Sequence, residues 1–168
     1  MQDGPEDLVI ASAETEPSAS VQELNEYDLD NAPCNLLKHA LKRAGEYVVA
    51  EIGDEGLRPR QFTTLIAIYQ NPGITQNDLV AVTGSDRSTT AELISRLDAR
   101  GDIIRERDPN DQRANRLFVS DAGTEALRQS LRGTLIAEQK FREIIEPGLR
   151  SEVFAGLRKL ADDGPIAE

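Results

Sequence analysis

The sequence contains very few of the residues on which metal binding and nucleophilic catalysis usually depend. It has one cysteine, Cys34, one histidine, His39, and no tryptophan. A single cysteine excludes a disulfide within the chain. The sequence also lacks a phosphate-cradling glycine loop, a cluster of metal ligands and a nucleophile elbow. These absences predict a protein that is not an enzyme and that uses no cofactor and no metal.

Long apolar runs and basic residues near the N-terminus are missing as well. No run of about 18 apolar residues is present, and the first residues lack the basic region and apolar core of a secretion signal. We therefore expect a soluble, cytoplasmic protein with no membrane partner. Residues 1–30 carry nine acidic residues and no basic one, whereas the other 138 residues carry 21 acids and 19 bases. Most of the net charge of −11 therefore comes from the N-terminal segment.

This acidic segment, residues 1–30, is predicted to be a mobile tail, at least to about residue 20. Serine, proline, alanine and glutamate dominate it, and its few large apolar side chains cannot offset the conformational entropy lost on ordering. Residues 21–29 could dock on the rest of the protein. Because the other 138 residues are close to neutral, the acidic composition does not exclude DNA binding by local clusters of arginine.

The middle of the chain is typical of two short helices joined by a tight turn. Thr75 can cap the first helix, with Asp78 reaching back to the first free amide. Gly84 interrupts the pattern, and Ser85 is placed to cap the second helix, which Gly101 closes in the left-handed conformation. Such a helix pair is the DNA-reading motif. The expected buried side chains of the two helices are Leu79, Val82, Ala91, Leu93, Ile94 and Leu97.

A β-hairpin is predicted directly after this helix pair. Its first strand begins at Ile103 and places Arg105 and Arg107 on one face, residues 108–111 form the turn, and residues 117–119 form the return strand. A new helix then opens at Asp121. The order of helix, helix, strand, turn, strand and helix is that of a winged helix-turn-helix.

The side chains predicted to contact DNA lie at the start of the second helix and on the hairpin. A recognition helix meets base edges and phosphates with its first turn, and a hairpin can place a guanidinium in the minor groove or on phosphates. The predicted contacts are Ser85, Arg87, Ser88, Thr89, Thr90, Arg105, Arg107, Asp111, Arg113 and Arg116. Two alternatives stay open. Serine and threonine are also favoured at helix N-termini for structural reasons, and winged helices also serve as protein-interaction modules without DNA binding.

Long helical segments are predicted on both sides of this region. One runs from about residue 33 to 53, a second from Pro59 to about Gln70 with Phe62, Leu65, Ile66 and Tyr69 on its inner face, and a third from Asp121 to an interruption at Pro147–Gly148, followed by a final helix. The fold class is therefore mainly α: a winged helix-turn-helix with a two-stranded β-wing, residues 57–120, and long N- and C-terminal dimerisation helices, residues 31–56 and 121–168.

The first and last helices have more apolar surface than a small winged domain can cover. We expect them to pair with the same helices of a second copy in an isologous homodimer. Such a dimer would place two recognition helices about one DNA turn apart, or roughly 34 Å, on an inverted repeat.

Residues 35 to 145 resemble the MarR group of bacterial transcriptional regulators. The matching segments are Leu57–Phe62, Gly73–Leu79, Asp86–Thr89, Leu97–Gly101 and Asp108–Arg113. The resemblance implies a triangular two-fold dimer that binds an inverted-repeat operator in double-stranded DNA as a sequence-specific regulator, in the role of a repressor. In that family the wing has an Asp-x-Arg pair, here Asp111 and Arg113, in which the aspartate holds the arginine that enters the minor groove. Ser120 stands where a threonine is more usual, which leaves the cap chemistry intact.

A candidate effector site is predicted on the first long helix. His39, Arg43 and Tyr47 are spaced four apart, so they share one face and could hold a carboxylate and an aromatic ring, together with Phe62 and Tyr69. The alternative is that these side chains are solvated. Family members that look similar at Leu57–Gln61 and Asp86–Thr89 respond to aromatic acids or their coenzyme A thioesters. The resemblance therefore implies an aromatic carboxylate or acyl-CoA effector that releases the DNA.

Cys34 provides a second hypothesis for sensing. Another branch of the family senses organic peroxides through a cysteine at the start of the same helix. In that pattern an aromatic residue follows the cysteine and a tyrosine lies one turn on, where this chain has Asn35 and Lys38. The departure favours an inert or half-buried thiol, with redox sensing as the alternative.

Overall fold

In the computed structural model, residues 19–54, 56–109 and 114–162 are described, and the chain divides into two compact units, residues 1–37 and 38–168. The first unit contains helix α1 (Val21–Glu26). A capping box begins this helix: the hydroxyl oxygen of Ser20 accepts from the Glu23 N–H, and the Glu23 carboxylate accepts from the Ser20 N–H at 2.7 Å. The sequence did not predict α1, because six residues are too few to establish a helical period. Residues 1–18 of the predicted tail lie outside the described part of the chain.

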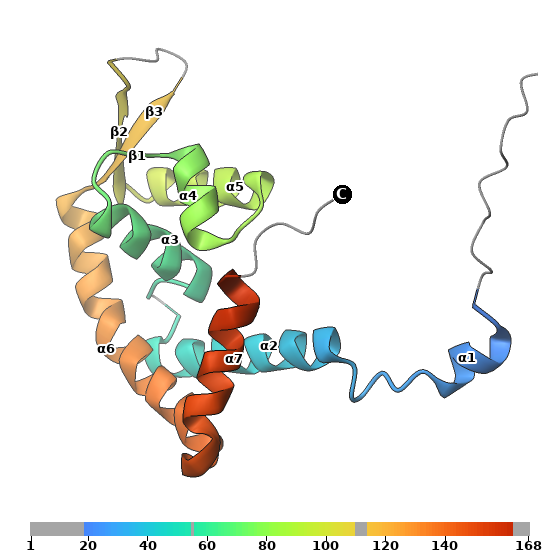
Figure 1. Ribbon diagram of the computed structural model, residues 1–168. Helices are drawn as coiled ribbons and strands as arrows, with labels where there is room; N and C mark the ends of the chain where they lie inside the picture. Colours follow the sequence, from blue (N-terminus) through green and yellow to red (C-terminus); the bar gives the residue numbers. More distant parts are fainter. Residues whose placement is uncertain (1–18, 55, 110–113, 163–168) are drawn as a thin grey trace, which may run out of the picture. The chain divides into compact units, whose positions relative to one another are not determined.

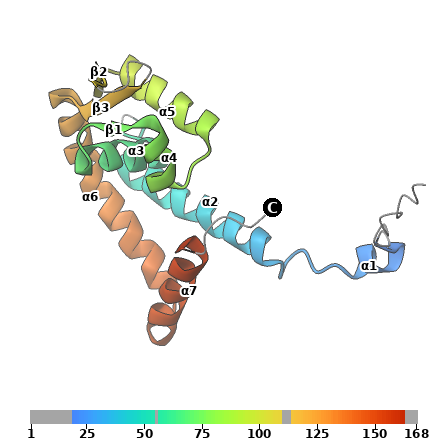
Figure 2. The same cartoon turned by 45° about the horizontal axis from the view of Figure 1, so that its top comes forward.

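The second unit is mainly helical, with a small antiparallel sheet next to its shorter helices (Figure 1 and Figure 2). Helix α2 begins in the first unit and ends in the second. The elements that follow α1 are α2 (Pro33–Ile52), α3 (Pro59–Gln70), β1 (Ile74–Thr75), α4 (Gln76–Thr83), α5 (Arg87–Ala99), β2 (Ile103–Arg107), β3 (Asn115–Val119), α6 (Asp121–Ile144), the 3₁₀ helix η1 (Pro147–Leu149) and α7 (Arg150–Asp162). The mainly α winged helix-turn-helix predicted from the sequence is therefore confirmed.

Side-chain caps start several of these helices where the sequence predicted them. Thr75 accepts from the Asp78 N–H at 3.3 Å and donates its hydroxyl to the Asp78 carboxylate at 2.6 Å. Ser120 accepts from the Gly123 N–H at 3.0 Å and so starts α6. The expected cap of α5 is wrong by one residue, because Asp86, not Ser85, has the extended backbone before the helix and reaches its third amide. Gly84, which ends α4, has a φ of 64°, a conformation that favours glycine.

The sheet has three strands in the order β1–β3–β2, one more than the predicted two-stranded wing. In the wing itself, Ile104 lies opposite Phe118 and Arg107 lies opposite Asn115. The additional strand, β1, pairs Ile74 with Leu117 and Thr75 with Arg116. A strand of two residues is too short to show an alternating pattern, so β1 is not predictable from the sequence.

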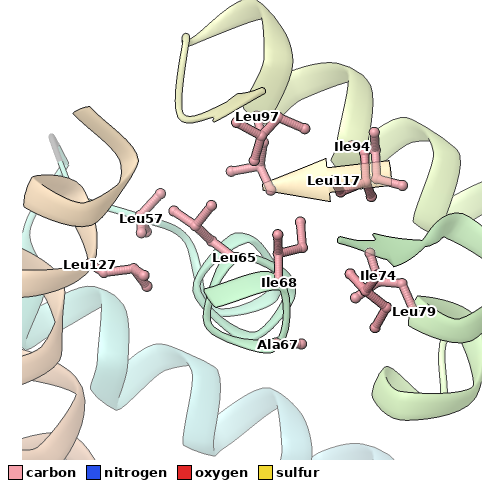
Figure 3. Close-up of a cluster of buried hydrophobic side chains, with 11 residues drawn as sticks. Leu57, Leu65, Ala67, Ile68, Ile74, Leu79, Ile94, Leu97, Leu117 and Leu127 are labelled. Atoms are coloured by element: carbon pink, nitrogen blue, oxygen red, sulfur yellow. The ribbon is translucent and has the colours of Figure 1, made fainter. Parts of the chain in front are cut away.

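The hydrophobic core lies between α3, α4, α5, the sheet and the start of α6 (Figure 3). Leu65 and Ile68 of α3 occupy its centre with no exposed surface, and Leu57, Ile94 and Leu97 are at most 2% exposed. The other core members are Ala67, Ile74, Leu79, Ile103, Leu117 and Leu127. The helix pair and the wing therefore pack on the same hydrophobic core.

Five expected core positions are wrong or only partly right. Tyr69 is 52% exposed and Val82 is 57% exposed, and Ala91 is also exposed. Phe62 and Ile66 are only partly buried at the edge of the core. On α3 the buried stripe therefore passes through Leu65 and Ile68. That helix contacts α4, α5, α6 and β3, so it is buried on several sides and has no single apolar face.

The junction between α2, α3 and α6 is closely packed. The Leu57 N–H donates to the Ser130 hydroxyl oxygen at 3.1 Å, in a buried position. A Cβ at Gly133 of α6 would lie 2.8 Å from Ile52 Cγ1, so the C-terminal end of α2 and the middle of α6 touch. Lys140 of α6 also forms an ion pair with Glu51. These contacts tie the connection between α2 and α3 to α6.

The long helices keep much of their apolar surface exposed. Neither α2 nor α7 has a fully buried residue, and Leu41 is 72% exposed. The other large apolar side chains left exposed on the long helices of the second unit are Leu131, Leu135, Ile136, Ile144, Val153, Leu157 and Leu160. None of the helices in the described ranges combines the length and the apolar character needed to cross a bilayer.

Candidate nucleic-acid interface and ligand cavities

The N-terminus of α5 is organised around the carboxylate of Asp86. One carboxylate oxygen accepts from the Thr89 N–H at 2.8 Å and from the Ser88 hydroxyl at 2.7 Å, and the other accepts from the Thr89 hydroxyl at 2.6 Å. These hydrogen bonds, led by those from Thr89, hold the pKa of Asp86 far below its ordinary value. The aspartate is therefore ionised at neutral pH and fixes both neighbouring hydroxyls.

The predicted contacts on α5 differ in their exposure. Arg87 and Ser88 are exposed and Thr89 is half-buried. Within the described residues Arg87 has no acidic partner at ion-pair distance, so its guanidinium is available to a phosphate. Thr90 cannot contact DNA as predicted, because it is only 1% exposed and donates its hydroxyl to the Asp86 carbonyl at 2.9 Å. Ser85 lies half-buried in the turn before the helix.

The predicted contacts on the wing are tied to acidic neighbours. Arg105 Nε lies 2.8 Å from the carboxylate of Asp98 on α5, and Arg116 Nε lies 2.7 Å from that of Asp108. The first pair joins the wing to α5, and the second joins its two strands next to the turn. Arg107, at the end of β2, also has an interaction partner. The remaining predicted wing contacts, Asp111 and Arg113, lie outside the described residues.

The structure does not bring the five predicted effector residues together. His39 and Arg43 are exposed on α2, and the Arg43 guanidinium stacks 5.5 Å from the Tyr47 ring. A hydrogen bond to Glu46 at 3.1 Å raises the pKa of Arg43. None of these three predicted residues lines either of the two cavities described below, because the opposite face of α2 is turned toward α3.

Phe62 and Tyr69, the other two predicted effector residues, line one small cavity between α3 and α6. It has a volume of about 140 Å³. The remaining lining residues are Ile66, Thr124, Leu127, Arg128 and Leu131. Arg128 is exposed and, among the described residues, has no carboxylate partner. An apolar cavity of roughly 150 Å³ accommodates a single aromatic ring, and an arginine at its edge can bind a carboxylate.

A larger cavity of about 1120 Å³ lies between α2, α3, α5 and α6. The sequence did not predict it, because its walls come from four separate elements. Helix α2 contributes Gly45 and Val49, α3 contributes Arg60, and α5 contributes Leu93 and Arg96. Its walls therefore include α5, the predicted recognition helix. In the described part of the chain, no group of three or more His, Cys, Asp or Glu side chains is placed to hold a metal ion.

Comparisons with known proteins agree with the winged-helix fold described above. The family model for the MarR family matches residues 55–114, from the start of α3 into the wing. A protein of Thauera aromatica assigned to regulation of the hcr operon is 27% identical over 106 residues, which are 63% of this chain and 64% of that protein. The chain thus spans slightly less than two thirds of that relative. The transcriptional repressor NicR of Pseudomonas putida is 25% identical over 151 residues, 90% of this chain and 96% of NicR.

Among solved structures, BpsR of Bordetella bronchiseptica has a similar fold. Its TM-score is 0.75 at 25% identity, with 82% of this chain and 99% of BpsR covered. The DNA binding of BpsR is regulated by 6-hydroxynicotinic acid. The similarity covers the winged region and extends to helices on both sides of it.

Proposed function

Because this chain belongs to the MarR family of winged helix-turn-helix transcriptional regulators, we propose that it is a repressor that binds an inverted-repeat operator as a homodimer and leaves it when a small aromatic acid binds. The observation that carries the proposal is the exposed start of α5, where Arg87 has no acidic partner among the described residues and Ser88 faces outward. A recognition helix needs this combination of a phosphate-binding cation and small polar groups near base edges.

Dimerisation is supported by the apolar side chains that α6 and α7 leave exposed. Leu135 and Ile144 on α6 and Leu160 on α7 are 55–63% exposed, and a large exposed apolar surface marks an interaction site. Covering them with the same helices of a second copy gives a closed two-fold assembly. Two recognition helices then meet successive major grooves, about 34 Å apart.

The small cavity between α3 and α6 supports an aromatic carboxylate as the effector. Its apolar walls, with Phe62 and Tyr69, suit one ring, and Arg128 offers two parallel N–H donors to a carboxylate. BpsR, which responds to 6-hydroxynicotinic acid, is a precedent for this chemical class. An acyl-CoA thioester would instead occupy the larger cavity that includes Arg60 and Arg96.

The DNA-binding proposal is tested with the full-length protein and DNA from upstream of its own gene. Fluorescence anisotropy at several salt concentrations should give specific binding that falls as salt rises. Arg87→Ala should weaken binding by about 1–3 kcal/mol and reduce the salt slope by about one. Arg158→Ala is the matched control, because this arginine is exposed on α7 and its loss changes the net charge equally. Binding no tighter than to random DNA would instead favour a protein-interaction module.

A further inference from the structure

The hydrogen bonds at the start of α5 have a direction that limits what Ser88 can do. An ionised carboxylate can only accept hydrogen bonds, so each hydroxyl bonded to Asp86 must donate its proton to it. The Ser88 hydroxyl donates to one oxygen at 2.7 Å, and the Thr89 hydroxyl donates to the other at 2.6 Å. The Thr89 N–H, at 2.8 Å, completes the arrangement. After these bonds the two hydroxyls retain only lone pairs.

Ser88 is the member of this group that faces outward. It is exposed, whereas Thr90, two residues later, is 1% exposed and Thr89 is half-buried. Ser95 lies two helical turns further along the same face and is exposed as well. The outer surface of α5 at Ser88 therefore offers a small group that can accept a hydrogen bond and has none to donate.

DNA offers few donors to such a group. Phosphate oxygens accept only, and so do N7 and O6 of guanine and O4 of thymine. The major-groove donors are the N6 amino group of adenine and the N4 amino group of cytosine. The negative charge of Asp86 next to the serine further disfavours a phosphate at this place.

We propose that Asp86 is a positioning residue for base recognition: it holds the Ser88 hydroxyl as an acceptor, so that Ser88 reads the amino group of an adenine or a cytosine. The inference rests on the proposed DNA-binding function and adds to it a base preference. The lowered pKa of Asp86 means that the arrangement persists throughout the neutral range.

The test begins with a duplex selected by the full-length dimer from a random library. Each adenine of one half-site is then replaced by purine, and each cytosine by 2-pyrimidinone, which removes one amino group at a time. At one position the replacement should weaken wild-type binding about 3- to 10-fold, the effect of one hydrogen bond. Ser88→Ala should cost as much on the natural duplex and nothing further on that analogue. If the two changes remove the same hydrogen bond, their effects do not add. If the base analogue only weakens base pairing, its effect adds to that of Ser88→Ala.

Asp86→Asn provides the second arm of the experiment. Asparagine still caps the helix, but its side-chain amide can donate to one of the two hydroxyls. The proton of that hydroxyl then points outward and can be donated to a base. The variant should therefore tolerate guanine or thymine at the position that the wild type restricts. Ser95→Ala should leave the restriction at that position unchanged, because it removes an exposed hydroxyl of the same helix that is not bonded to Asp86.

Two results would overturn the inference. The loss caused by Ser88→Ala could persist in full on every duplex that lacks an amino group, or it could disappear when one phosphate is replaced by a methylphosphonate, which would identify a phosphate contact. In both cases specific binding would remain and the proposed function would stand. If the wild type selected no duplex at all, the proposed function would fail and this inference with it.

Discussion

Leu57 and Ser130 are joined by a buried hydrogen bond that spans 73 positions of the chain, with 3.1 Å between the Leu57 nitrogen and the serine oxygen. Both residues are 1% exposed, so neither group can turn to water instead. Leu57 belongs to the connection that leads from α2 into α3, and Ser130 lies in the middle of α6. This bond therefore couples the long helices to the first helix of the DNA-binding region.

Ser130→Ala should destabilise the protein by about 1–3 kcal/mol, because the Leu57 N–H would remain buried without an acceptor. Urea unfolding followed by circular dichroism measures the change. Ser95→Ala removes the same group from an exposed site on α5 and should alter stability by about 0.5 kcal/mol or less. Equal unfolding midpoints for both variants would mean that the hydrogen bond between Leu57 and Ser130 does not stabilise the protein.

Gly133→Ala should also be destabilising, by about 1–3 kcal/mol, because the new methyl group would meet Ile52 Cγ1 at 2.8 Å and the Glu51 carbonyl oxygen at 3.2 Å. Gly156→Ala in α7 is the matched control, since no heavy atom lies within 4 Å of its added Cβ. That substitution should stabilise the helix by up to about 1 kcal/mol. From highest to lowest, the unfolding temperatures should rank Gly156→Ala, wild type, Gly133→Ala. An unfolding temperature of Gly133→Ala equal to or above that of the wild type would show that α2 and α6 adjust without cost.

Arg128→Ala should abolish most of the response to an aromatic acid while leaving operator binding intact. The lost charge-assisted contact is worth about 1.5–3 kcal/mol, so the thermal shift caused by the acid should largely vanish. Arg132→Ala, one turn further along α6 and exposed, should keep the response. An unchanged response in Arg128→Ala would remove the cavity between α3 and α6 from the mechanism.

Two further variants separate the effector site predicted on α2 and the peroxide-sensing hypothesis from the proposed cavity between α3 and α6. Arg43→Ala should have no effect on the response, because Arg43 is engaged with Glu46 and Tyr47 on a face of α2 that lines neither cavity. Cys34→Ser should also respond normally. Loss of the response in Cys34→Ser alone would replace the aromatic-acid hypothesis with peroxide sensing.

The cap at Asp86 should contribute to stability in a pH-dependent way. Its pKa is lowered from an ordinary value of 3.8 by hydrogen bonds from Thr89 and Ser88. A carboxylate whose pKa is lowered by folding stabilises the protein fully above the unfolded value, and this contribution is lost as the pH falls through the folded value. The difference in unfolding midpoint between wild type and Asp86→Asn should be constant from about pH 5 to 8 and shrink below about pH 4. A difference that does not change down to about pH 3 would contradict this.

Much of the fold could be predicted because its strongest signals are local. Thr75 and Ser120 accept from amides three residues away at the starts of α4 and α6, and Pro59 fixes the backbone φ at the start of α3. Gly84 and Gly101 adopt positive φ angles. The cap of α5 was misplaced because Ser85 and Asp86 are both good capping residues. Only the backbone conformation distinguishes them.

The sites were harder to predict because they depend on how elements pack. His39, Arg43 and Tyr47 do share one face of α2, as their spacing requires, but spacing cannot tell which face turns inward. The residues that do face the larger cavity from α2 include Gly45 and Val49, which carry no chemical signal. The sequence predicts Thr90 at the DNA surface, whereas its burial depends on how α5 packs against its neighbours, which include α3 and α4.

Thr75 belongs to two structures at once. Its backbone pairs with Arg116 in the return strand of the wing, and its side chain begins α4 through Asp78. A wing that shifted by itself would have to break this pairing or disturb the first turn of α4. The return strand of the wing and the first turn of α4 are therefore linked through one residue. In the proposed complex with DNA, a signal from the long helices that displaced the wing would also displace the start of α4.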